Sequence, residues 1–194
     1  MNNNLLDNAE VIQWCHKPIT KFSLVNTSDP KKLKIANNIE NNWARSIIGG
    51  SGNQWTTSLC QNLVKEALIR QGQKNVTSTT FKKSSIRNKR YSPDIESDDF
   101  VYEVKGRSWT TPGTAGEKIL GVPLKYGEIP TLYKKPLKII LVGYQEYEAK
   151  MGYAFGNLLN KNDQTKELND SLNYFRKHNI EYIGFTDMLK NIGL

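Results

Sequence analysis

Cysteine, histidine and long apolar runs are all scarce in this 194-residue chain, and each scarcity excludes a class of protein. The two cysteines, Cys15 and Cys60, lie far apart, which favours buried free thiols in a reducing compartment over a disulfide. The two histidines, His16 and His178, have no spacing typical of a zinc site. No stretch approaches the ~20 apolar residues of a membrane span, and residues 1–4 do not begin a signal peptide. We therefore expect a soluble, cytoplasmic protein with no membrane partner.

Acidic residues are outnumbered by basic ones, and this balance favours a polyanionic partner. The chain has 27 lysines and arginines against 19 aspartates and glutamates, a formal net charge of +8. Nucleic acid is one such partner, although ribosomal and membrane-surface proteins share the same excess. The densest basic cluster, residues 82–90, is either a contact to a DNA backbone or a solvated basic loop.

Two carboxylates and an amine are predicted to meet at one place. In the apolar segment that contains Glu103, Val104 and Lys105, the strand period of two sends Glu103 and Lys105 to one face and Val104 into the core. The polar run at residues 96–99 predicts a hairpin turn. That turn folds Asp94 back beside Glu103.

These residue types suit phosphodiester hydrolysis with a divalent metal ion. Asp94 and Glu103 are hard oxygen ligands of the kind that Mg²⁺ prefers, and the backbone carbonyl of Val104 is a third candidate ligand. Mn²⁺ is an expected substitute. Bound metal lowers the pKa of water, while the Lys105 ammonium positions the nucleophile or stabilises developing charge. The expected products carry a 5′-phosphate and a 3′-hydroxyl.

The pair Pro93-Asp94 followed by Glu103-Val104-Lys105 resembles the signature of the PD-(D/E)xK nuclease superfamily, and more narrowly its type II restriction endonucleases. The resemblance implies an α/β fold with an αβββαβ core, a mixed central sheet flanked by helices, over residues 54–185. It also implies double-stranded DNA as substrate. Cutting both strands of a palindrome requires two sites related by a twofold axis, so we expect a homodimer.

A helix is predicted over residues 55–68, where apolar residues recur at helical spacing and Gly72 is a stop signal. This is the position of the superfamily's first core helix, which often supplies another acidic group. Glu66 is therefore a candidate catalytic residue. The alternative is a local pair between Glu66 and Arg70 one helical turn later.

The remaining elements fit one endonuclease domain over residues 1–194, with a helical N-terminal segment at 1–48 that wraps the core. β-branched or apolar runs predict strands at residues 75–81, 137–143 and 180–185. A helix between the last two is predicted from residue 164 to 177.

Several cationic or aromatic residues are candidate DNA contacts because of their charge and their position near the motif. Arg107 has the same strand parity as Lys105, so it can face the scissile phosphate. Trp109 and Tyr126 bracket a glycine-rich segment and either stack on bases or pack in the core. The candidate DNA contacts are Arg87, Lys89, Arg90, Arg107, Trp109, Lys118 and Lys125.

The leading interpretation is a sequence-specific, metal-dependent DNA endonuclease. A nuclease with the same chemistry that recognises branched or mismatched DNA, as a repair nuclease or junction resolvase does, is the nearest alternative. A non-catalytic DNA-binding module is the alternative from another class, and it would bind DNA with Asp94 neutralised and without metal.

Overall fold

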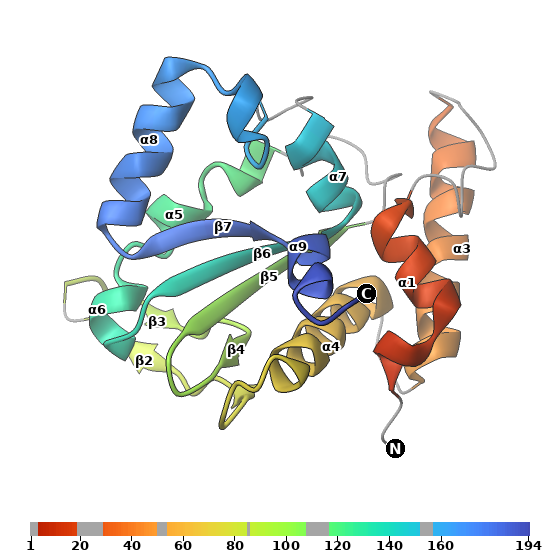
Figure 1. Ribbon diagram of the computed structural model, residues 1–194, viewed down its shortest axis with the longest axis horizontal. Helices are drawn as coiled ribbons and strands as arrows, with labels where there is room; N and C mark the ends of the chain where they lie inside the picture. Colours follow the sequence, from red (N-terminus) through yellow and green to blue (C-terminus); the bar gives the residue numbers. More distant parts are fainter. Residues whose placement is uncertain (1–3, 19–28, 50–53, 85, 108–116, 152–156) are drawn as a thin grey trace.

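A five-stranded mixed sheet forms the centre of the protein in the computed structural model (Figure 1). The structure describes residues 4–18, 29–49, 54–84, 86–107, 117–151 and 157–194. In spatial order the strands are β1 (Thr77–Ser78), β4 (Ile95–Glu96), β5 (Val101–Arg107), β6 (Leu137–Gly143) and β7 (Ile180–Gly184). β1, β4 and β5 pair antiparallel, whereas β5, β6 and β7 pair parallel. The protein is therefore of the α/β class, as predicted.

The central strand β6 has the bounds that its sequence predicts. It runs through an apolar, β-branched segment and pairs with β5 on one side and β7 on the other. Both faces of such a strand are covered, which explains a nearly continuous apolar run in place of alternation. The predicted strand at 180–185 is likewise confirmed as β7.

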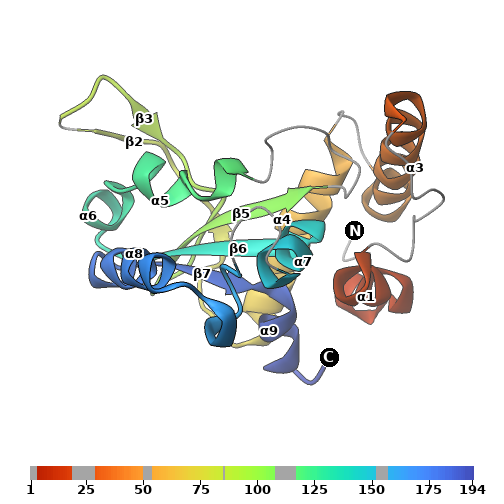
Figure 2. The same cartoon turned by 90° about the horizontal axis from the view of Figure 1, so that it is seen from above.

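Helices cover both faces of the sheet (Figures 1 and 2). Within the described residues, the helices and three short 3-10 turns are η1 (Leu5–Asp7), α1 (Ala9–His16), α3 (Pro30–Ile48), α4 (Trp55–Arg70), η2 (Glu117–Ile119), α5 (Val122–Lys125), α6 (Ile129–Tyr133), α7 (Tyr144–Met151), η3 (Lys161–Asp163), α8 (Lys166–Lys177) and α9 (Phe185–Lys190). The helices predicted at 55–68 and 164–177 are confirmed as α4 and α8.

Side-chain alternation along β5 separates two cores. Tyr102 and Val104 belong to a cluster with α1, α4 and α9, while Val101 belongs to a cluster with α5, α6 and α8. Val104 therefore points into the core, as predicted. Glu103 and Lys105 share the opposite face with Val101.

The N-terminal segment is helical where the structure describes it, and it supplies large side chains to the first cluster. Trp14 on α1 is fully buried, and Ala44 on α3 is buried in the same cluster. Cys15 and Cys60 are buried free thiols, as predicted. Burial raises the pKa of both thiols, because it disfavours the thiolate.

The prediction of one strand over residues 75–81 is wrong in extent. Only Thr77 and Ser78 pair in the sheet, as the exposed edge strand β1. This stretch of threonine and serine offers no alternating apolar face to bury, so little holds a longer strand on the sheet. The chain then leaves the sheet and forms a separate antiparallel pair, β2 (Lys82–Lys83) with β3 (Arg90–Tyr91).

Candidate active site

The hairpin formed by β4 and β5 carries the candidate site. Its register pairs Ile95 with Tyr102, so continuing the register by one residue sets Asp94 opposite Glu103. Residues opposite each other on antiparallel strands share a face of the sheet. The hairpin turn lies at residues 97–100, one position later than predicted.

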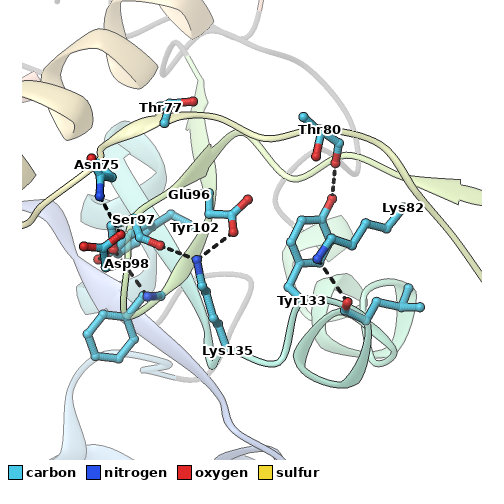
Figure 3. A network of polar contacts seen from close by, with 12 residues as sticks. Asn75, Thr77, Thr80, Lys82, Glu96, Ser97, Asp98, Tyr102, Tyr133 and Lys135 are labelled. Atoms are coloured by element: carbon cyan, nitrogen blue, oxygen red, sulfur yellow. Dashed lines mark hydrogen bonds and ion pairs between the residues drawn. The ribbon is translucent and has the colours of Figure 1, made fainter.

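Polar contacts fix this turn to neighbouring segments (Figure 3). Lys135 donates from its Nζ to Glu96 Oε1 at 2.7 Å and to the Ser97 carbonyl at 2.6 Å. On the other side, Asn75 Nδ2 donates to Asp98 Oδ1 at 2.9 Å. Because the first half of the turn is tied down from two sides, a slip of register that would send Glu103 to the wrong face is opposed.

Asp94 is held in place by two hydrogen bonds to its carboxylate. The Val104 N–H donates to Oδ2 at 2.7 Å, and Gln61 Nε2 on α4 donates to Oδ1 at 2.7 Å. The preceding carbonyl, that of Pro93, accepts from the Thr79 hydroxyl. The carboxylate is thus fixed beside the middle of β5 before any ligand arrives.

Glu103 and Lys105 form an ion pair on the same face of β5. Lys105 Nζ donates to Glu103 Oε1, and the side chain of Glu103 is only 3% exposed against 28% for Lys105. The second oxygen, Glu103 Oε2, is buried and has no hydrogen-bond partner within the part of the chain that the structure describes. A buried carboxylate oxygen without a partner is costly unless something else binds it.

The electrostatics of the two carboxylates favour a cation. Burial raises the pKa of Glu103, which Lys105 opposes and the charge of Asp94 reinforces. Burial also raises the pKa of Asp94, whereas the Val104 N–H, the Lys105 charge and the Gln61 amide each lower it. A divalent ion would compensate both negative charges and satisfy Glu103 Oε2.

The donor set fits Mg²⁺ better than zinc. The described residues contain no group of three or more histidine, cysteine, aspartate or glutamate side chains arranged to hold a metal ion. Zinc sites normally need such a group. Mg²⁺ is usually held by one or two carboxylates and keeps several waters, so Asp94 and Glu103 are the described residues that could hold it.

Tyr126 closes the far side of the site. Its ring centroid lies 6.0 Å from Lys105 Nζ and 4.6 Å from Lys125 Nζ. Burial, followed by the Glu103 charge, raises the pKa of the Tyr126 hydroxyl, which keeps it protonated. Tyr126 is buried in the second core, so the packing role weighed for it is confirmed. Its closeness to Glu103 places it at the wall of the site as well.

Gln61 is a site residue that the sequence analysis missed. It lies on α4 one turn before Lys65, whose charge also acts on Asp94. Residues four apart share a helix face. The available signal was two polar side chains, at i and i+4, beside the apolar stripe of the predicted helix, but the pattern does not say what they face.

Glu66 is not brought to Asp94 and Glu103. Its carboxylate accepts hydrogen bonds from the Leu5 N–H at 2.7 Å and the Leu6 N–H at 3.3 Å. It also pairs with Arg70 at 2.6 Å, the local pair that was the alternative interpretation. Glu66 lies five residues after Gln61, about 140° around the helix, and so faces the N-terminal segment and not Asp94.

The candidate DNA contacts fall into two surface groups and one group without described side chains. Arg87, Lys89 and Arg90 lie on or near the β2–β3 pair, and Lys118 and Lys125 are exposed near α5. The remaining two are outside the described side chains: Arg107 is described only as the backbone end of β5, and Trp109 lies in an undescribed segment.

Comparisons with protein-family models, with curated proteins and with solved structures find no match to this chain. Among the described helices, none combines the length and the apolar character that crossing a membrane requires. The geometry of the site is therefore the basis for any functional assignment.

Proposed function

We propose that this chain hydrolyses phosphodiester bonds in nucleic acid with the help of a divalent metal ion. The observation that carries the proposal is the meeting of Asp94, Glu103 and Lys105 on one face of the β4–β5 hairpin. The buried, unpartnered Oε2 of Glu103 supports a cation at this place. The net charge of +8 favours a polyanionic substrate.

More narrowly, we propose a type II restriction endonuclease of the PD-(D/E)xK superfamily, acting on double-stranded DNA as a homodimer. Helix α4, the antiparallel strands β1, β4 and β5, and the parallel neighbour β6 follow the order expected of an αβββαβ core. This order of elements and the sequence motif together support the narrower proposal.

Each site residue has a distinct task in this proposal. Asp94 and Glu103 would hold Mg²⁺, which would supply a water of lowered pKa and positive charge against the phosphate. Gln61 and the Val104 N–H orient Asp94. Lys105 holds Glu103 in the absence of substrate, and its ammonium is available to the developing negative charge of the phosphate once metal binds Glu103.

The test is cleavage of a long duplex DNA by purified protein with Mg²⁺ or Mn²⁺, followed by sequencing of the fragment ends. We expect discrete fragments with 5′-phosphate and 3′-hydroxyl ends that disappear with EDTA. Asp94→Ala and Lys105→Ala should abolish cutting, whereas Asp170→Asn, at an exposed carboxylate on α8, should not.

Three outcomes separate the alternatives. Cutting confined to branched or mismatched DNA would indicate the structure-specific nuclease. Binding without cutting, unchanged by Asp94→Ala, would indicate the DNA-binding module. Cutting that survives Asp94→Ala would overturn the assignment of the site.

A further inference from the structure

The β2–β3 pair and the described residues of its turn, 81–84 and 86–91, form an arm that stands apart from the main sheet. Figure 2 shows the arm extending away from the body of the protein beside α5 and α6. Lys82 pairs with Tyr91 and Lys83 with Arg90, in a two-stranded sheet of its own. We call residues 81–84 and 86–91 the arm.

The arm is strongly basic along its whole length. Its sequence holds five cations, Lys82, Lys83, Arg87, Lys89 and Arg90, and no acidic residue. Arg87 pairs with Glu128 at 3.2 Å, whereas no described carboxylate pairs with Lys83, Lys89 or Arg90. These three side chains are exposed, so the arm presents uncompensated positive charge to solvent.

The arm also carries the two most exposed large apolar side chains among those described. Ile86, in the turn, is 85% exposed, and Phe81, at the base, is 72% exposed. A single exposed apolar residue needs no explanation. Here the apolar turn residue sits exposed among cations, and core packing does not explain its exposure.

The base of the arm is fixed, so the arm is presented in a defined direction (Figure 3). Tyr133 on α6 donates from its hydroxyl to the Thr80 carbonyl at 2.5 Å and the Tyr91 carbonyl at 3.2 Å. Lys82 Nζ donates to the Leu132 carbonyl at 3.2 Å and lies 4.3 Å from the Tyr133 ring. A ligand held by the arm is therefore held at a set distance from α6.

The same base adjoins the candidate active site. The Tyr91 ring packs 6.2 Å from that of Tyr126, which in turn lies beside Lys105 and Glu103. Asp94 follows Tyr91 by three residues in the chain. A polyanion bound along the arm would thus run toward the two carboxylates.

We propose that the arm binds duplex DNA by entering the major groove, with Lys83, Lys89 and Arg90 on the phosphates and Ile86 against the base edges. This inference rests on the proposed function for the identity of the polyanion. The major groove admits a two-stranded β-ribbon, and apolar side chains contact thymine methyl groups there. Cations on both strands of the ribbon suit the phosphates on both walls of the groove.

The first experiment measures binding of a labelled duplex in EDTA at several salt concentrations, by fluorescence anisotropy. For B-DNA the slope of log K against log salt is about −0.9 per neutralised phosphate. The triple variant Lys83→Gln, Lys89→Gln, Arg90→Gln should therefore weaken the slope by about 2 to 3. The matched control neutralises three exposed lysines away from the arm, Lys31, Lys34 and Lys177, and should leave the slope unchanged.

Ile86→Ala tests the apolar contact separately. It should weaken binding about 3- to 10-fold with no change in slope, because it removes apolar contact and no charge.

Dimethyl sulfate footprinting then shows which groove of the DNA the protein occupies. Wild-type protein should protect guanine N7, in the major groove, and the triple variant should lose that protection. Protection confined to adenine N3, in the minor groove, would overturn the proposal.

The outcomes also separate this inference from the proposed function. If the triple variant binds with wild-type slope and affinity while the wild type cleaves, the arm is not the binding element and the nuclease assignment stands. If the wild type binds through the arm but no divalent metal supports cleavage, the arm inference stands and the nuclease assignment falls. Circular dichroism of the triple variant verifies its folding in either case.

Discussion

Gly106 on β5 lies directly against Cys60 on α4: a Cβ atom on residue 106 would stand 2.2 Å from Cys60 Sγ and 3.0 Å from Cys60 Cβ. The first distance is shorter than atoms tolerate and the second is tighter than most contacts, so glycine lets the strand approach the helix this closely. The contact joins two elements of the site, because α4 carries Gln61 and β5 carries Lys105 immediately before Gly106.

Gly106→Ala should therefore destabilise the fold by about 1–3 kcal/mol through overpacking. The molecules that still fold should also cleave more slowly, because β5 must move away from α4. Urea unfolding gives the first quantity and cleavage assays the second. The double variant with Cys60→Ala removes the Sγ and should recover part of the loss. Additive losses in the double variant would show that the two residues do not compete for this space.

Gln61→Ala should reduce cleavage and lower the free energy of unfolding by about 1–3 kcal/mol, because it leaves Oδ1 of the partly buried Asp94 without its hydrogen-bond partner. That hydrogen bond lowers the pKa of Asp94, so its loss should shift the acidic limb of the pH–rate profile to higher pH. Asn62→Ala, at the exposed neighbouring position on α4, is the control. An unshifted profile would remove Gln61 from the site.

Asp94→Asn should make the protein more stable than the wild type at pH 7. Burial raises the folded-state pKa of Asp94 above 3.8, so the wild type loses stability as pH rises through that range, while asparagine stays neutral. Unfolding measured from pH 7 downward should show the difference closing as pH approaches 3.8. A difference that is independent of pH would mean that charge is not its cause.

Mg²⁺ should reverse that order of stability. A ligand of the folded state at 100 times its Kd adds about 2.7 kcal/mol, and Asp94→Asn loses one of the two carboxylates that would bind it. Thermal unfolding with Mg²⁺ should thus raise the midpoint of the wild type and barely move that of the variant. Equal shifts in both proteins would place the ion elsewhere.

Glu66→Ala should lower the free energy of unfolding by about 1–3 kcal/mol and leave cleavage by the folded protein unchanged. The substitution removes the acceptor for the Leu5 and Leu6 N–H groups and the partner of Arg70. Glu167→Ala, at an exposed position on α8, is the control. Lost cleavage with unchanged stability would restore the catalytic interpretation of Glu66.

The elements that the sequence predicted best are those whose apolar residues repeat with a clear period. The stripe on α4 and the continuous run of β6 both match the structure, because burial against the sheet or within it dictates the pattern. The face shared by Glu103 and Lys105 was predicted for the same reason, since the strand period allows no other arrangement.

The remaining features depend on contacts between distant segments. An apolar stripe shows which face of α4 is buried, but not whether Gln61 or Glu66 borders the site. That choice depends on two long-range contacts. Leu5 of η1 binds Glu66, which is 61 positions away in the chain, and Asp94 binds Gln61, which is 33 positions away. The basic cluster of the arm was recognised, but its two strands were missed, because its lysines and arginines carry no apolar period and only the pairing of β2 with β3 reveals strands.

The arm's cations have a further consequence for the protein before it meets any ligand. β2 and β3 pair only with each other, so each leaves one backbone edge open within the described part of the sheet. Open edges are templates for pairing with another chain, and lysine or arginine on them opposes that pairing through repulsion between like charges. At high concentration, neutralising Lys83 and Arg90 should therefore favour intermolecular β-sheet and precipitation, which makes the same charges a safeguard of solubility.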